Sequence, residues 1–215
     1  MPLEIHPVVE SDLPEFCRMQ LASFNNGMAS KLNPAPHTPE TLQRFTAKSL
    51  KSFHNEADVH FLKVVDTELD GELIAGAKWR VNETARTEAQ IQGMLPMPGP
   101  GDDENLAAQN FMLYLRQARR KFMGTKPFYF LHLIFTDAEH RNRGAAAMLV
   151  RWGTEKADRA QLPAYLEATE VGKPLYAKLG FEAVHEEVFD LEKYGAAGTE
   201  ANTVMIREPV ARQEG

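Results

Sequence analysis

The sequence predicts an α/β protein built on one mixed, mostly antiparallel central sheet of about six or seven strands, flanked by helices. The main observation is a βαβ order: an apolar run at 127–137, an amphipathic helical segment at 144–161 and a strand-like run at 163–169. Such a unit places its two strands parallel to each other. A second observation is the pair of strand-like runs at 58–66 and 72–82, whose short connection favours an antiparallel hairpin.

Turn and capping residues define the other elements. Asp70-Gly71 is the turn signal of the hairpin. Thr38 precedes Pro39 and is expected to cap a helix, and Gly180 is expected to end one. The remaining predicted elements are a strand at 3–9, a helix at 13–24, a loop at 25–37, helices at 39–53, 102–124 and 172–180, and strands at 181–191 and 202–210.

Composition narrows the class of protein. The chain has 215 residues, of which 43% are hydrophobic, enough for one sizeable domain. The net charge of −6 argues against a general nucleic-acid binder and is compatible with a cationic substrate such as an amine. Cys17 is the single cysteine, so a reducing, cytoplasmic home is expected, with the nucleus as an alternative. We expect no signal peptide and no membrane association, because no long apolar run is present.

Residues 83–126 are predicted to be a helical insertion in a single domain that spans 1–215. A Pro/Gly-rich connector at 93–104 leads into the helix at 102–124, which has acidic residues at its start and basic residues near its end. The basic residues are Arg116, Arg119, Arg120 and Lys121. They are suited to hold a phosphate, but a solvated helix end is the more usual role of such a cluster.

The turn at the centre of the βαβ unit has the composition of an anion-binding site. A helix N-terminus presents unpaired N–H groups and a partial positive charge, so it attracts phosphate. Gly144 lets a ligand approach the backbone, Ala145 and Ala146 add little bulk, and Arg141 and Arg143 supply cationic donors. The turn is either a pyrophosphate-binding loop or an ordinary strand–helix connection. It matches neither a Walker loop nor a dinucleotide-binding fingerprint.

Two motifs resemble the GCN5-related N-acetyltransferase (GNAT) superfamily. Residues 141–146, Arg-Asn-Arg-Gly-Ala-Ala, match its R/Q-x-x-G-x-G/A signature after a long apolar strand. Residues 174–182, PLYAKLGFE, resemble its second segment, L-Y-x-x-x-G-F. The two occur in the family's order with a strand between them. The order of predicted elements also fits, so the resemblance covers most of the chain except 83–126.

The resemblance implies a fold, a donor and a reaction. The fold is the acyl-CoA N-acyltransferase fold, in which the two parallel strands splay apart. The reaction moves an acetyl group from acetyl-CoA, the acyl donor substrate, directly to a primary amine of a small molecule or peptide in a ternary complex. The implied pyrophosphate-binding residues are Arg141, Asn142, Arg143, Gly144, Ala145 and Ala146. The implied strand edge for the pantetheine arm is Leu133, Ile134 and Phe135.

The candidates for proton transfer are Tyr176, Glu167 and His132. The resemblance places Tyr176 where the family has its general acid, whereas the residue pattern alone also fits a core aromatic. Glu167 lies in the strand at 163–169 and is either a general base or a structural hydrogen-bonding group. His132 lies in the apolar strand, where a satisfied core histidine is more usual than a base. The sequence has no His/Cys cluster with metal-ligand spacing, so no metal is expected.

The alternatives concern what the scaffold does with an acyl-CoA. The main one is a non-catalytic acyl-CoA-binding module that has lost its acceptor site. Others are a longer acyl group or transfer to a hydroxyl. The acceptor is expected to contact the loop at 25–37 and the helical stretch at 105–115, neither of which has a recognisable signature. We expect no nucleic-acid or membrane partner, and a homodimer is possible through exposed strand edges.

Overall fold

The computed structural model describes residues 2–25, 27–97 and 105–211, and it contains one seven-stranded mixed sheet. Along the sheet the strands run in the order β1-β2-β3-β4-β5-β7-β6. Only β4 and β5 are parallel, as predicted. The strands are β1 (Leu3–Pro7), β2 (Val59–Asp66), β3 (Glu72–Asn82), β4 (Phe128–Thr136), β5 (Ala164–Thr169), β6 (Glu182–Asp190) and β7 (Thr199–Arg207).

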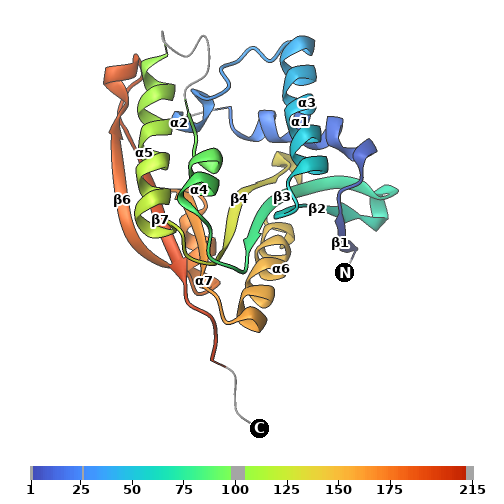
Figure 1. The fold of residues 1–215 in the computed structure, drawn as a ribbon. Helices are drawn as coiled ribbons and strands as arrows, with labels where there is room; N and C mark the ends of the chain where they lie inside the picture. The colour runs from blue at the N-terminus through green and yellow to red at the C-terminus, as the bar shows by residue number, and fades with distance from the viewer. Residues whose placement is uncertain (1, 26, 98–104, 212–215) are drawn as a thin grey trace.

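Helices cover both faces of the sheet (Figure 1). Helices α1 and α3 pack on one face, α6 and α7 pack on the other, and α5 lies beside β6 and β7. The helices are α1 (Leu13–Ser23), α2 (Gly27–Ser30), α3 (Pro39–Asn55), α4 (Glu88–Met94), α5 (Leu106–Phe122), α6 (Ala145–Ala160) and α7 (Lys173–Lys178). Below, "the α6 face" and "the α3 face" name the two sides.

The parallel strands β4 and β5 pair over only three residues and then separate. Tyr129, Phe130 and Leu131 of β4 face three residues of β5. Beyond them β4 stays paired with β3 up to Thr136, while all of β5 is paired with β7. A gap therefore opens between β4 and β5 toward their carboxyl ends, which is the splayed arrangement that was predicted.

A β-bulge lies in β4 where the gap opens. Lys78 of β3 pairs with Leu133, but the next residue of β3, Trp79, pairs with Leu131. His132 is therefore the extra residue of the bulge. Bulges twist a strand and redirect its side chains, and they are frequent beside active sites.

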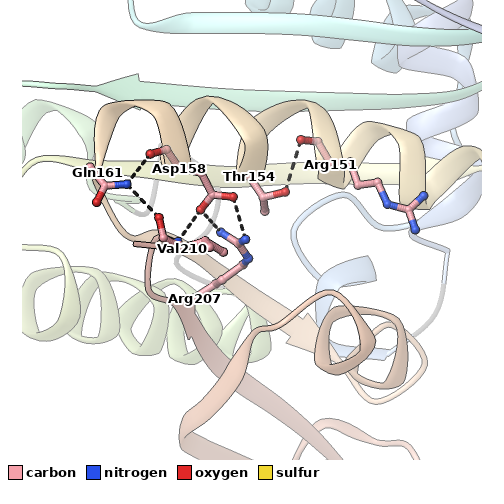
Figure 2. Close-up of polar contacts among 6 residues, drawn as sticks. All are labelled: Arg151, Thr154, Asp158, Gln161, Arg207 and Val210. Carbon is pink, nitrogen blue, oxygen red and sulfur yellow. Dashed lines mark hydrogen bonds and ion pairs between the residues drawn. The ribbon is translucent and has the colours of Figure 1, made fainter. Parts of the chain in front are cut away.

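Helix α6 is fixed along the sheet by close contacts. The Trp79 indole N–H donates to the Leu149 carbonyl at 3.0 Å. At Gly153 a Cβ would meet the Trp79 ring at 2.3 Å, so only glycine lets the helix approach this closely. Figure 2 shows the other end of the helix, where the Asp158 carboxylate accepts two hydrogen bonds from Arg207, at 2.7 and 2.8 Å. Those bonds lower the pKa of Asp158 and tie α6 to the end of β7.

The segment between β3 and β4 contains two helices, of which one was predicted. Helix α4 was missed because the Pro/Gly-rich composition dominated the prediction, yet Thr87 and Gln90 form a capping box at its start. Helix α5 begins with Asn105 as its N-cap, whose side chain accepts from the Ala108 N–H. The predicted start at 102–104 lies outside the described residues. Helix α5 buries a second apolar core against β5, β6 and β7.

The prediction that the basic residues at the end of α5 are solvated is wrong for Arg119. Arg119 is buried, whereas Arg120 and Lys121 are exposed. The difference follows from helical periodicity, because Arg119 lies on the same side as Leu115, which packs in the core. The sequence pattern had grouped these residues by charge alone.

Candidate functional site

The turn between β4 and α6 presents free backbone N–H groups. A short 3-10 turn, Ala138–His140, follows β4, and Asn142 and Gly144 then take positive φ values of 63° and 92°. Helix α6 starts with no side-chain cap, and its first internal hydrogen bond runs from the Met148 N–H to the Gly144 carbonyl. The N–H groups of residues 144–147 thus lack helical acceptors and point out of the helix.

Gly144 is required by its backbone conformation rather than by crowding. Its φ of 92° is a value that L side chains rarely adopt, whereas a Cβ built there meets nothing within 4 Å. The space in front of the uncapped N-terminus is therefore open. A phosphate placed there would meet several N–H groups and the positive end of the helix dipole.

The Arg143 side chain positions the turn instead of extending freely. Its guanidinium donates to the Asp66 carboxylate at 2.5 Å and contacts the His140 ring nitrogen at 3.0 Å. Burial opposes the charge on Asp66, but bonds from Arg143 and from the Glu68 N–H outweigh it and lower the pKa of Asp66. Arg143 thus anchors the turn to the end of β2, a contact that sequence reasoning missed. Arg141 is exposed.

The edge of β4 that faces β5 is unpaired where Leu133, Ile134 and Phe135 lie. The last described pair between the two strands is Leu131 with Leu166. Leu133 and Ile134 are half-buried, although they lie in the middle of the sheet. Phe135 is buried, and its ring centroid lies 4.8 Å from that of Phe16. Extended backbone with unpaired N–H and C=O groups is suited to bind an elongated amide-containing ligand.

Tyr176 lies on the α6 face, in the same apolar cluster as Ala145 and Leu149 at the start of α6. Its ring makes an edge contact with Phe181 at 6.1 Å. Burial raises the pKa of Tyr176 well above its ordinary value, so the phenol stays protonated. The structure thus places this predicted residue on the face of the sheet that α6 covers.

Glu167 lies on the α3 face and is held by two partners. Its oxygens accept hydrogen bonds from Arg119 of α5 at 2.8 and 2.9 Å, and the Tyr165 hydroxyl donates to one of them at 2.9 Å. The side chains of Arg119 and Glu167 are only 9% and 7% exposed. The Arg119 guanidinium also lies over the Phe130 ring, at 4.8 Å from its centroid. A carboxylate bound in this way is oriented by its partners, and both of its oxygens are engaged.

His132 lies on the same side of the sheet and has a free ring nitrogen. Its Nδ1 is buried without a hydrogen-bond partner among the described residues. Burial lowers its pKa well below 6.5, and the charges of Arg119, Lys78, Arg80 and Lys48 lower it further. The imidazole is therefore neutral at physiological pH, with a lone pair available on at least one nitrogen.

Comparisons with known proteins identify the family of this site. The sequence matches the acetyltransferase (GNAT) family over residues 24–181. The chain belongs to the GNAT family. The matched range includes the uncapped turn, the splayed strands and Tyr176.

Individual relatives of this GNAT chain are distant. It is 39% identical over 46 residues to a probable acyltransferase, SID5, of Ajellomyces capsulatus, a match that spans 21% of this chain and 34% of that protein. A histone acetyltransferase HPA2-related structure from Corynebacterium glutamicum superposes with a TM-score of 0.63 at 17% identity, covering 99% of both chains. Arylalkylamine N-acetyltransferase 2 from Aedes aegypti gives 0.64 at 13% identity, covering 97% and 99%. These structures support the fold.

Metal-binding groups and membrane-spanning helices are both lacking among the described residues. In residues 2–25, 27–97 and 105–211, no group of three or more His, Cys, Asp or Glu side chains is arranged to hold a metal ion. Within the same ranges, no helix combines the length and apolar character needed to cross a bilayer.

Sequence reasoning singled out the turn, the strand edge and Tyr176 as candidates, but it did not single out Asp66, Lys78 or the pairing of Arg119 with Glu167. Lys78 interrupts the apolar strand β3, and a lysine in such a place is a usable signal because buried lysines are rare unless paired. The partners of Asp66 and Arg119 are 77 and 48 residues away in the sequence. No local pattern predicts such pairs.

Proposed function

We propose that this GNAT protein is an N-acetyltransferase that transfers an acetyl group from acetyl-CoA directly to a primary amine. The observation that carries the proposal is the uncapped N-terminus of α6 beside the unpaired edge of β4. The helix N-terminus is suited to bind phosphate, and the strand edge is suited to bind amides. Acetyl-CoA contains a pyrophosphate followed by an amide-containing arm. The acyl group would lie where β4 and β5 are no longer paired.

The donor would occupy both predicted binding elements. Its pyrophosphate lies against the N–H groups of residues 144–147, with Asn142 and Arg143 shaping the turn. Its pantetheine arm runs along Leu133–Phe135 and pairs with the free backbone groups there. The thioester then lies at the bulge of β4, between the two faces of the sheet. The amine reaches it from the α3 face.

Tyr176 is proposed as the group that meets the leaving thiolate. It lies on the α6 face of the sheet. Because burial keeps its phenol protonated, it presents an O–H donor to sulfur as the C–S bond breaks. The same burial removes water that would otherwise solvate the thiolate. This assignment favours an enzyme over a module that only binds acyl-CoA.

His132 is proposed as the proton acceptor for the attacking amine. It is neutral, it has an unpartnered nitrogen and it lies at the bulge where the strands part. The proton to be taken is that of the amine nitrogen after attack, when the nitrogen is positive and acidic. Glu167 was the other candidate base, but its two oxygens are engaged by Arg119. We assign Glu167 the role of orienting Arg119.

The test is acetyl-CoA binding by a Gly144→Glu variant, measured by calorimetry. The new carboxylate would repel the pyrophosphate, and we expect affinity to fall at least about 100-fold, the range of a lost charge-assisted contact. Gly195→Glu is the matched control, because Gly195 also has a positive φ (77°) and open space around its Cβ, but lies in the turn between β6 and β7. Undiminished binding by folded Gly144→Glu would refute the proposed phosphate site.

A further inference from the structure

Lys78 occupies the α3 face next to the proposed reaction centre. It pairs across the sheet with Leu133 and therefore neighbours the bulged His132. Its ammonium group donates to the Ser52 hydroxyl at 2.8 Å and lies 5.1 Å from the centroid of the Phe61 ring. Lys78 thus connects the underside of α3 with the part of the sheet where the strands splay.

Lys78 has no carboxylate of its own. The nearby carboxylates of Glu56 and Asp58 both bind Arg80. Among the ion pairs of the described residues, none includes Lys78. Burial, followed by repulsion from Arg80, lowers its pKa to about 8. A desolvated ammonium without a counter-ion is costly to the fold, so a purely structural role does not account for it.

Other groups around Lys78 also lack strong partners. The Thr46 hydroxyl on α3 is buried and meets only the Cys17 thiol, a weak hydrogen-bonding group. His132 Nδ1 is unpartnered as well. We call Thr46, Ser52, Lys78 and His132 the Lys78 cluster. Its members come from α3, β3 and β4. Ser52 is the member with strong partners, because its hydroxyl accepts from Lys78 and donates to the Glu56 carboxylate.

Counted with the exposed Lys48, the charges around the Lys78 cluster leave one cation in excess. Four cations act on His132: Lys48, Lys78, Arg80 and Arg119. Three carboxylates balance them, namely Glu56 and Asp58 on Arg80 and Glu167 on Arg119. A ligand carrying one negative charge would complete the balance. Lys78 is half-buried rather than sealed, and so are His132 and Leu133, so solvent reaches the place where this charge would lie.

We propose that the acceptor of this enzyme is an amine that carries a carboxylate, as an amino acid does, and that the Lys78 cluster binds that carboxylate. Lys78 holds the carboxylate, which leaves the amino group beside His132 and the open edge of β4. This inference rests on the proposed acetyltransferase function and names the class of its acceptor. It differs from the expectation of a purely cationic amine that the net charge allowed.

The test uses matched acceptors, namely amino acids and the amines formed by their decarboxylation, such as tyrosine and tyramine. We expect wild-type kcat/KM to be at least about tenfold higher for the acid than for the amine, from one hydrogen-bonded charge pair. Lys78→Met should abolish this preference, mainly by raising KM for the acid. Lys51→Met, an exposed lysine on α3, is the control. Lys78→Gln is the second variant should the methionine fail to fold.

Three outcomes distinguish failure of the carboxylate subsite from failure of the proposed acetyltransferase function. If wild-type protein does not bind acetyl-CoA, the proposed function fails first. If acetyl-CoA binds but the acids and amines are acetylated equally well, or Lys78→Met impairs both alike, the carboxylate subsite is refuted while the acetyltransferase stands. If no acceptor in the panel reacts, binding of N-acetylated acids and N-acetylated amines to the CoA complex is compared, and equal affinity also refutes the subsite.

Discussion

At the scale of single residues, the site depends on groups whose hydrogen-bonding capacity is not met inside the protein. His132 Nδ1 and the Thr46 hydroxyl are buried polar atoms without strong partners. Folded proteins satisfy most buried polar atoms, so exceptions require an explanation. The bulge in β4 explains His132, because an extra residue in a strand turns its side chain away from the regular pattern. We propose that a ligand between β4 and β5 supplies the missing partner of His132.

The prediction for His132 concerns rate and pH. His132→Asn should lower kcat about 100- to 1,000-fold, within the range of a lost general base, while acetyl-CoA affinity stays the same. Because burial and four nearby cations lower its pKa, His132 stays neutral as the pH falls through 6.5. The wild-type rate should therefore show no loss of activity centred at pH 6.5, which an ordinary histidine base would cause. Stopped assays of thiol release measure both effects.

A suitable control for that experiment is His60→Asn. His60 is also a strand histidine whose pKa is lowered by burial, but it packs against Trp152 on the α6 face. The His60→Asn variant should have a kcat within about twofold of the wild-type value. A His132→Asn variant with wild-type kcat would show that His132 does not accept the proton. Proton transfer through water would then be the explanation.

At the scale of elements, α5 places the Arg119 guanidinium over the Phe130 ring of β4 and in contact with Glu167 of β5. The ion pair of Arg119 with Glu167 joins the segment between β3 and β4 to strand β5. Helix α5 also buries Phe111, Tyr114 and Leu115 in the second apolar core. Deleting this helix would expose that core, so point substitutions test its contribution to the site better than a deletion.

The prediction for α5 is a double-mutant cycle. Glu167→Leu alone should lower the free energy of unfolding by about 3–5 kcal/mol, because it leaves Arg119 buried and uncompensated. Adding Arg119→Met removes that charge and should recover most of the loss. Denaturant unfolding measures each variant. If the losses in the free energy of unfolding simply add in the double variant, Arg119 and Glu167 are not energetically coupled.

At the scale of the whole molecule, local signals predicted the scaffold and long-range contacts completed the site. The cap at Thr38 is a property of a few adjacent residues, and the structure has it as predicted. The positive φ of Gly144 was not predicted. The fold class was predicted because β4, α6 and β5 each have a clear hydrophobic pattern. The anchoring of Arg143 by Asp66 was not predicted, because only the folded sheet brings β2 beside the turn.

The splay divides the sheet into two parts that meet only through the first residues of β4 and β5. One part is β1 to β4 and the other is β5, β7 and β6. The described pairing between them ends at Leu131 with Leu166. Such a sheet exposes backbone groups in its middle, which a folded protein normally avoids. The proposed donor would cover them, so ligand binding should change the stability of this region more than that of the sheet's outer strands.

The last prediction follows from this division and is measured by hydrogen exchange with and without acetyl-CoA. Amides of Leu133–Phe135 that face β5 and those of residues 144–147 should exchange at least about tenfold more slowly with donor at 100 times its Kd, since binding adds up to about 2.7 kcal/mol to the cost of opening. Amides of Glu167–Thr169 that already pair with β7 should change little. Protection of β6 instead, with no change along β4, would place the donor elsewhere and contradict both the phosphate site and the strand edge.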